Sequence, residues 1–144
     1  MSEGMVATQD GLGTETSLSE TLGKYAHWTL RAALASVFIY HGAQKLSGLE
    51  QFAQMMNLTY LVALLVALAE FGGGILVLAG GVTRDWVTRL GAAALVPVMI
   101  GAITLVHWGQ WGFVPTAAYP MGGSEFQTTL LLISLYFLLK GNRA

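Results

Sequence analysis

Apolar residues gather in four long runs along this chain, and short polar segments separate them. The runs cover about Ala26–Gly42, Leu58–Gly81, Val87–Val106 and Phe126–Leu139. The second and third runs have the ~20 residues that a helix needs to cross a hydrocarbon core. The last run would span only ~21 Å at 1.5 Å per residue, so we expect it to begin near Gly122, to meet a thinned bilayer or to lean on the preceding loop. The pattern predicts an all-α fold, an integral membrane four-helix transmembrane bundle.

The two longer connections also carry patterns. Between the first two runs, apolar residues recur at three- and four-residue steps: Leu46, Leu49, Phe52, Ala53 and Met56. This spacing predicts an interfacial amphipathic helix lying on the membrane surface. The connection before the fourth run, HWGQWGFVPTAAYPMGGSE, is aromatic and rich in Gly and Pro. It is long for a simple link between helices, so we expect it to act as a cap.

Composition agrees with a membrane class, since 54% of the 144 residues are hydrophobic and only 10% are charged. Soluble domains usually carry about a quarter charged residues, so we expect the lipid bilayer to be this chain's partner. The net charge of −1 gives no reason to expect a nucleic-acid partner. The chain has no cysteine, which excludes disulfides, thiolate metal sites and dithiol redox chemistry within it. Electron transfer would need a bound cofactor or a protein partner.

Residues 1–24 have no basic segment followed by an apolar core, so we interpret them as a flexible cytoplasmic tail and not as a signal peptide. Residues 25–141 form the predicted membrane domain. The tail, the second connection and the C-terminus hold five basic residues, whereas the first and third connections together hold only Lys45. The positive-inside rule then predicts that both termini are cytoplasmic. The five are Lys24, Arg84, Arg89, Lys140 and Arg143.

Glu70 lies near the middle of the second apolar run. A carboxylate at bilayer depth costs several kcal/mol unless it is protonated or paired, so Glu70 is a candidate functional residue. Arg31 in the first run is a plausible partner, because antiparallel helices would place the two at depths differing by ~7 Å. Three interpretations stay open: an ion pair that only fixes helix register, a protonatable site serving a quinone or a proton path, and no contact. In the functional interpretation Glu70 and Arg31 are the catalytic pair.

His41, Lys45, His107 and Glu125 stand at the ends of the runs, all at the expected outer face. Histidine and carboxylate near one interface suit hydrogen bonding to a quinone and passage of its proton to water. Two histidines at similar depth are also compatible with a haem or metal, but ligands of haem in a bundle usually lie deeper than helix ends. Alternatively the histidines are interfacial anchors. We predict no metal site.

The chain resembles the DoxX family of small four-helix bacterial membrane proteins over about Tyr25–Gly141. The resemblance rests on an arginine in the first helix, the segments FIYHGAQKLSG and ALAEFGGGILVLAGGVTR, a third helix ending in His107, and GGSE before the last helix. Similar proteins are subunits of a thiosulfate:quinone oxidoreductase and of a terminal quinol oxidase, and others belong to complexes that answer oxidative stress. The resemblance implies a location in the bacterial inner membrane and quinone as cofactor.

Residue by residue, eight positions match the polar and glycine positions of the family: Arg31, His41, Gly42, Lys45, Glu70, Gly73, His107 and Glu125. The leading function is therefore a membrane subunit of a quinone-linked oxidoreductase, with a protein partner and a possible homo-oligomer. A non-catalytic scaffold or assembly subunit is the alternative. A small-molecule or proton transporter is a third class, although no inverted repeat is visible at this length.

Overall fold

A computed structural model describes residues 18–143, where every regular element is helical. The predicted all-α fold is therefore confirmed for this part of the chain. Residues 18–25 already form helical turns ahead of the first labelled helix. The labelled elements are α2 (His27–Ser47), α3 (Leu49–Met55), α4 (Tyr60–Gly80), α5 (Asp85–Leu105), α6 (Glu125–Lys140) and the 3-10 turn η1 (Gly141–Arg143). Residues 1–17 of the predicted tail lie outside the described residues.

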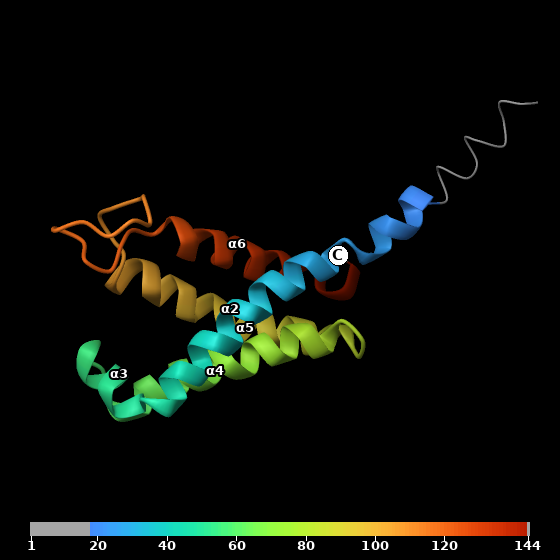
Figure 1. The fold of residues 1–144 in the computed structure, drawn as a ribbon. Coiled ribbons are helices and arrows are strands. Elements are labelled where there is room, and N and C mark those ends of the chain that lie inside the picture. The colour runs from blue at the N-terminus through green and yellow to red at the C-terminus, as the bar shows by residue number, and fades with distance from the viewer. Residues whose placement is uncertain (1–17, 144) are drawn as a thin grey trace, which may run out of the picture.

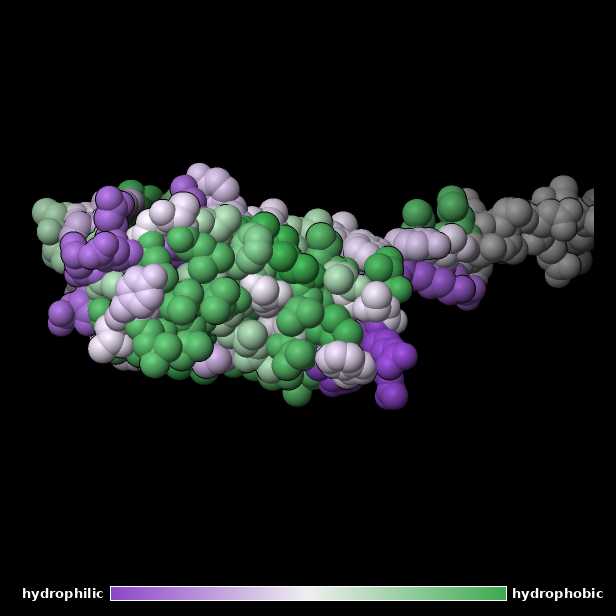
Figure 2. Space-filling view, turned by 90° about the horizontal axis from the view of Figure 1, so that it is seen from below, coloured by the Kyte–Doolittle hydropathy of each residue, from purple (hydrophilic) through white to green (hydrophobic). Residues whose placement is uncertain are grey.

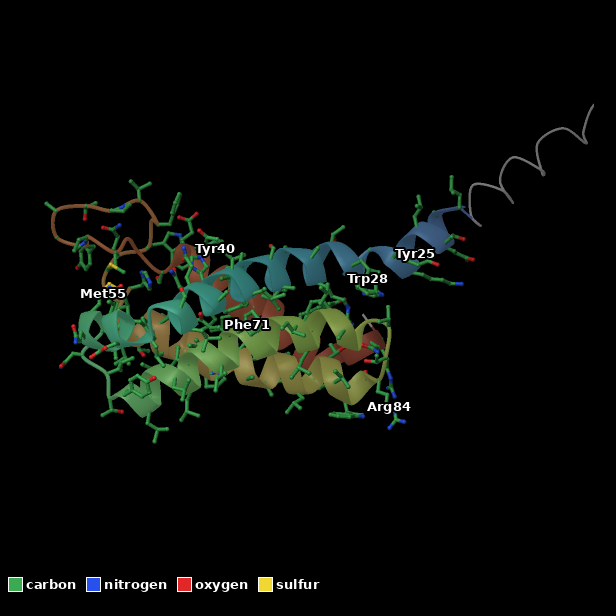
Figure 3. All side chains as sticks on the ribbon, turned by 60° about the horizontal axis from the view of Figure 1, so that its bottom comes forward. Tyr25, Trp28, Tyr40, Met55, Phe71 and Arg84 are labelled. Atoms are coloured by element: carbon green, nitrogen blue, oxygen red, sulfur yellow. The ribbon has the colours of Figure 1, made fainter. Side chains whose placement is uncertain are left out.

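The four long helices pack in chain order, α2 against α4, α4 against α5 and α5 against α6. The short helix α3 and the loop 106–124 lie at one end of this bundle, which we name the α3 end (Figure 1). The turn 81–84 and η1 lie at the other end, named the C-terminal end. Met55 on α3 and Arg84 accordingly mark opposite ends of the molecule (Figure 3).

Apolar side chains fill the centre of the bundle. Leu34 and Phe38 of α2, Val77 of α4, Leu95 of α5 and Phe137 of α6 are at most 1% exposed and belong to one cluster. Each of the four long helices therefore contributes to a common core. Burial of one such side chain contributes about 1.5–3 kcal/mol in water, and close packing maintains it in lipid.

The outer surface is apolar as well. On α4 alone, Leu61, Leu65 and Leu68 are 48–64% exposed. A broad hydrophobic band crosses the middle of the face seen in Figure 2, and hydrophilic residues gather at its two ends. By length and composition, α4 and α5 are two helices in residues 18–143 that qualify to cross a membrane. The band and these two helices are those of an all-α membrane bundle.

Small residues bring α2 and α4 into close contact. A Cβ on Gly42 would collide with the backbone of Phe71, and one on Gly74 would lie 3.2 Å from the backbone nitrogen of Ile39. Such positions let membrane helices approach closely. They also fix the antiparallel register, because residues near 42 face residues near 71.

The amphipathic pattern of α3 is used against α4. Leu49 and Ala53 are buried and pack with Ala63 and Ala67, while Glu50 faces outward. The short helix thus closes over the start of α4, whose first turn is capped by the side chain of Thr59.

The last helix begins at Glu125, so the expected start near Gly122 is wrong. Contact with the preceding loop, another of the alternatives, is what the structure contains. The backbone N–H groups of Gly123, Ser124 and Glu125 donate to carbonyls of residues 110–112, at 2.9–3.0 Å. The loop 106–124 is therefore folded onto the start of α6.

Candidate functional site

Glu70 is buried in α4, with 3% of its surface exposed, and its partner is Lys45. The Lys45 Nζ atom lies 2.5 Å from Glu70 Oε2. Lys45 comes from the last turn of α2, and its ammonium also lies 5.2 Å from the centre of the Phe52 ring. An ammonium beside a buried carboxylate compensates part of the cost of removing that charge from water.

The expected contact between Arg31 and Glu70 is wrong. Arg31 Nη1 donates to the carbonyl of Val77 at 2.5 Å, and Val77 lies seven residues beyond Glu70 on α4. Seven residues are ~10 Å along a helix axis, more than the two side chains bridge in this packing. Gly42 stands near Glu70 instead, and Lys45 extends back to the carboxylate from one turn farther along α2.

The Lys45–Glu70 pair lines a cavity of about 740 Å³ at the α3 end of the bundle. His41 of α2, His107 after α5 and Gln127 of α6 line the same cavity, so it joins polar groups from four elements. The rest of the wall is largely apolar, and includes Val37, Phe38, Phe52, Val66, Met99, Leu105, Phe126 and Leu130. Drug-sized ligands usually bind in cavities of this size and composition.

His107 is 8% exposed, and the protein uses both of its ring nitrogens. Nδ1 lies 3.1 Å from the carbonyl oxygen of Gly122, and Nε2 lies 3.0 Å from the amide nitrogen of Gln127. A carbonyl only accepts and an amide NH₂ only donates, so this network assigns a neutral His107 protonated at Nδ1. In this arrangement Gln127 Oε1 is buried without a hydrogen-bond partner.

His41 and Glu125, the other members of the predicted outer cluster, occupy less central places. His41 is exposed at the edge of the cavity, with its ring edge-on to Tyr40 at 5.4 Å. Glu125 is exposed, does not line the cavity, and accepts a hydrogen bond of 3.3 Å from the backbone of Phe113. The structure therefore brings His41, Lys45 and His107 together with Glu70, and leaves Glu125 to the loop.

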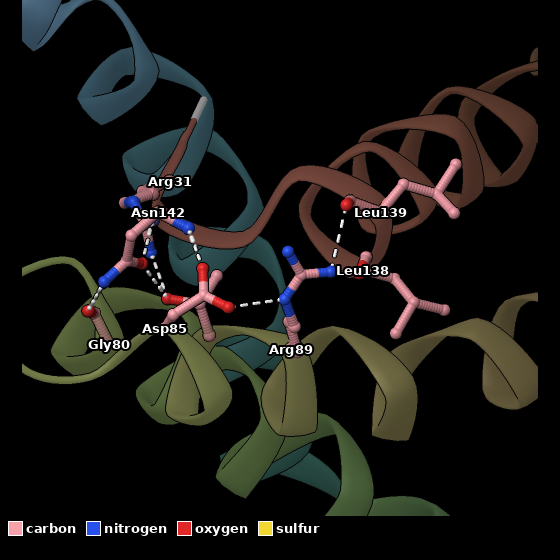
Figure 4. A network of polar contacts seen from close by, with 8 residues as sticks. Arg31, Gly80, Asp85, Arg89, Leu138, Leu139 and Asn142 are labelled. Carbon is pink, nitrogen blue, oxygen red and sulfur yellow. Dashed lines mark hydrogen bonds and ion pairs between the residues drawn. The ribbon is translucent and has the colours of Figure 1, made fainter.

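Arg31 lies in a separate polar network at the C-terminal end (Figure 4). The side chain is fully buried, and its Nη1 and Nη2 atoms donate to Thr88 Oγ1 and Asn142 Oδ1, both at 2.9 Å. Its Nε donates to His27 Nδ1 at 3.1 Å, and the Phe137 ring centre lies 4.7 Å from the guanidinium carbon. Neutral acceptors and a ring face therefore surround this cation.

Asn142 joins the chain end to the helices around it. Its side-chain nitrogen donates to the Gly80 carbonyl at 2.8 Å, and its backbone nitrogen donates to Asp85 Oδ1 at 2.7 Å. Asp85 Oδ2 accepts from Arg89 Nε at 2.6 Å, and Arg89 continues to the carbonyls at the end of α6. Gly141 has a φ of 60°, and a Cβ there would collide with Asp85. The network ties α2, α4, α5 and η1 together.

Sequence reasoning missed Gln127 and Asn142. A signal existed for Gln127, which is a polar residue in the first turn of an otherwise apolar helix. Asn142 carried no such signal, because it follows the last run in a short polar C-terminus. Among residues 18–143, no three His, Asp or Glu side chains are grouped as metal ligands would be.

Comparison with known proteins identifies the family. A family model described as DoxX matches residues 26–108, more than half of the chain. The chain belongs to the DoxX family. A similar protein is the Putative oxidoreductase CatD of Bacillus subtilis (strain 168), which is 32% identical over 117 residues. The alignment covers 79% of this chain and 78% of that DoxX-like relative. No solved structure matches this chain. The resemblance read from the sequence is confirmed, and DoxX is a membrane family, in agreement with the apolar band.

Proposed function

We propose that this DoxX protein is the membrane subunit of a quinone-linked oxidoreductase, and that the cavity at the α3 end binds the quinone head group. One observation carries the proposal: the Lys45–Glu70 pair lies in the wall of a cavity of about 740 Å³ that is otherwise largely apolar. A buried charge pair is weak evidence for stability, whereas charges beside a cavity at membrane depth favour ligand or proton handling.

The residues present fit a quinone head group. A quinone has a flat apolar ring with two oxygens, and it supplies two-electron, two-proton chemistry when bound. The apolar lining suits the ring and its lipid tail, since Val37, Val66 and Leu105 come from three different helices. Lys45 keeps N–H donors beyond the one that it gives to Glu70, because an ammonium has three. The orphaned Gln127 Oε1 is a further polar group without a protein partner.

We assign roles to residues by their position in the cavity. Lys45 donates a hydrogen bond to a ring oxygen, and Glu70 accepts or returns a proton beside it. His41, exposed at the cavity edge, exchanges protons with water. Arg31 does not line the cavity and is assigned to the structural network at the C-terminal end. Glu125 holds the loop in place.

We further propose a location in the bacterial inner membrane with α2, α4, α5 and α6 as spans and both termini cytoplasmic. Arg84 lies in the turn 81–84, Lys140 ends α6 and Arg143 ends η1, so these basic residues share the C-terminal end. Basic residues concentrate on the cytoplasmic side of membrane proteins. In this orientation the cavity opens toward the outer half of the bilayer, and a homo-oligomer remains compatible with it.

Binding of a short-chain ubiquinone to the purified protein in lipid nanodiscs tests the proposal. We expect calorimetric binding by the wild type and at least ~10-fold weaker binding by Glu70→Gln, because Lys45 and the carboxylate no longer act as a charged pair; a hydrogen bond to a charged group contributes about 1.5–3 kcal/mol. Glu50→Gln makes the same change on the exposed face of α3 and should bind as the wild type does. Wild-type heats no larger than those of empty nanodiscs, or unaltered binding by a folded Glu70→Gln protein, would contradict the proposal.

A further inference from the structure

Gln127 is the one cavity residue whose hydrogen bonding is incomplete among the residues described. Its Nε2 donates to His107 Nε2, and its Oε1 is sealed from water without a partner. An unsatisfied buried acceptor is unfavourable, so native proteins contain few of them. Each one invites the question of what pairs with it in the working protein.

The orientation of this amide is fixed by its neighbours. The Gly122 carbonyl requires a proton on His107 Nδ1, which leaves Nε2 of the neutral ring as an acceptor. Only the NH₂ group of Gln127 pairs with such an acceptor, so the amide oxygen must point the other way. Turning the amide around would place two acceptors against each other. The network therefore presents an oxygen, and not an N–H group, as the free atom.

The free oxygen is close to the cavity. Gln127 is half-buried and lines the cavity wall together with Phe126 and Leu130 of the same helix. The last torsion of a glutamine side chain is broad, so a modest rotation turns Oε1 toward the cavity while Nε2 stays beside His107. A ligand that supplies a donor satisfies Oε1, whereas a ligand with acceptors alone leaves it unpaired.

We propose that Gln127 makes the cavity selective for the reduced, hydroxyl-bearing form of its ligand, a hydroquinone, over the corresponding quinone. This inference rests on the proposed function, because it takes the ligand to be of the quinone class. The two forms share ring and tail, and differ in that a hydroquinone oxygen donates a hydrogen bond and a quinone oxygen only accepts. Acceptor atoms on both walls, Gln127 Oε1 and the Glu70 carboxylate, favour the donor.

The test is anaerobic titration of the protein in nanodiscs with decylubiquinol and, separately, with decylubiquinone. We expect the wild type to bind the quinol at least ~5-fold more tightly, the ratio that one neutral hydrogen bond provides. Gln127→Leu should bring the ratio to about one, mainly by weakening quinol binding. Gln127→Glu should keep the preference, because a carboxyl group beside His107 retains a free acceptor oxygen in either protonation state.

Gln54→Leu is the matched control, since it makes the same change on the exposed face of α3 outside the cavity lining. If Gln127→Leu does not fold, Gln127→Met removes the amide without branching, and the wild-type ratio decides by itself. Equal wild-type affinities for the two forms, or an unchanged preference in the folded Gln127 variants, overturn this inference and leave the proposed function standing. Absence of binding by either form overturns both.

Discussion

At the residue scale, two buried cations of this protein are stabilised in different ways. Lys45 meets the carboxylate of Glu70 in a cavity wall, and its side chain is 23% exposed. Arg31 is fully buried and is surrounded by oxygen acceptors, one histidine nitrogen and the Phe137 ring. The planar guanidinium with five donors suits such a fixed neutral cage, whereas the flexible ammonium suits a site whose partner exchanges protons.

The Lys45–Glu70 pair yields a prediction that separates structure from function. Lys45→Met leaves the Glu70 carboxylate buried without its partner, and breaking one side of a buried pair costs about 3–5 kcal/mol. Replacing both residues, in Lys45→Met/Glu70→Leu, should recover most of that loss, because apolar residues of similar volume often substitute for a buried pair. Unfolding in mixed micelles with increasing SDS measures both variants. We expect the stable double variant to lose quinone binding.

Two results would contradict this view of the pair. A Lys45→Met protein as stable as the wild type would mean that Glu70 is protonated or hydrated without Lys45. A double variant that is stable and still binds quinone would mean that the pair only fixes helix register, as the alternative interpretation of the sequence has it. Glu50→Gln, exposed on α3, is the control for a change of charge alone.

At the element scale, apolar runs predicted the helices closely. The run Leu58–Gly81 became α4 (Tyr60–Gly80), and Val87–Val106 became α5 (Asp85–Leu105). Hydrophobic length constrains a spanning helix, so these bounds are readable from one sequence. Register between helices is not, since it depends on which glycines meet which backbone. The contact of Gly42 with Phe71 decides that Lys45, and not Arg31, lies within reach of Glu70.

The polar residues show the same division. Glu70 was found because a carboxylate in an apolar run is conspicuous, and Lys45, His41 and His107 because they end helices. Their assembly into one cavity followed from a packing arrangement that the sequence does not state. Gln127 was missed because a neutral amide in a first turn is common, and its significance comes only from its contact with His107.

The element η1 is a short segment that holds longer ones, and Asn142 is its central residue. Asn142→Leu would remove an acceptor from both Arg31 and Thr88, and a donor from the Gly80 carbonyl. Leaving buried groups unsatisfied costs about 1–3 kcal/mol each, and more for a charged group. We expect a clear loss of SDS resistance in Asn142→Leu with unchanged quinone affinity in the protein that remains folded, because the cavity lies at the opposite end.

Lys140→Gln is the matched control for this variant, since it alters an exposed polar side chain two residues away. It should unfold as the wild type does. Equal stability of Asn142→Leu and Lys140→Gln would indicate that water satisfies Arg31 in the absence of Asn142, and that the network contributes little.

At the scale of the whole molecule, the polar chemistry is divided between the two ends of an apolar bundle. The C-terminal end holds a closed network in which Asn142 and Arg31 bond to each other and to the helices. The α3 end holds a cavity with polar groups that remain partly free. A rigid end opposite an open end is the arrangement expected of a site that admits a ligand from the surrounding bilayer, because binding sites are held by well-packed supports.

The last prediction concerns a partner. The chain has no cysteine, and its described residues contain no grouped metal ligands, so electrons for a quinone would have to come from another protein. We expect tagged protein purified from its native membranes in mild detergent to retain a stoichiometric protein that carries a redox cofactor, identified by mass spectrometry and absorbance. Glu70→Gln should retain the same protein, because its carboxylate is buried and takes no part in an outer surface. Recovery of the chain as a lone oligomer that binds quinone would contradict the subunit assignment and favour a self-contained quinone site or transport.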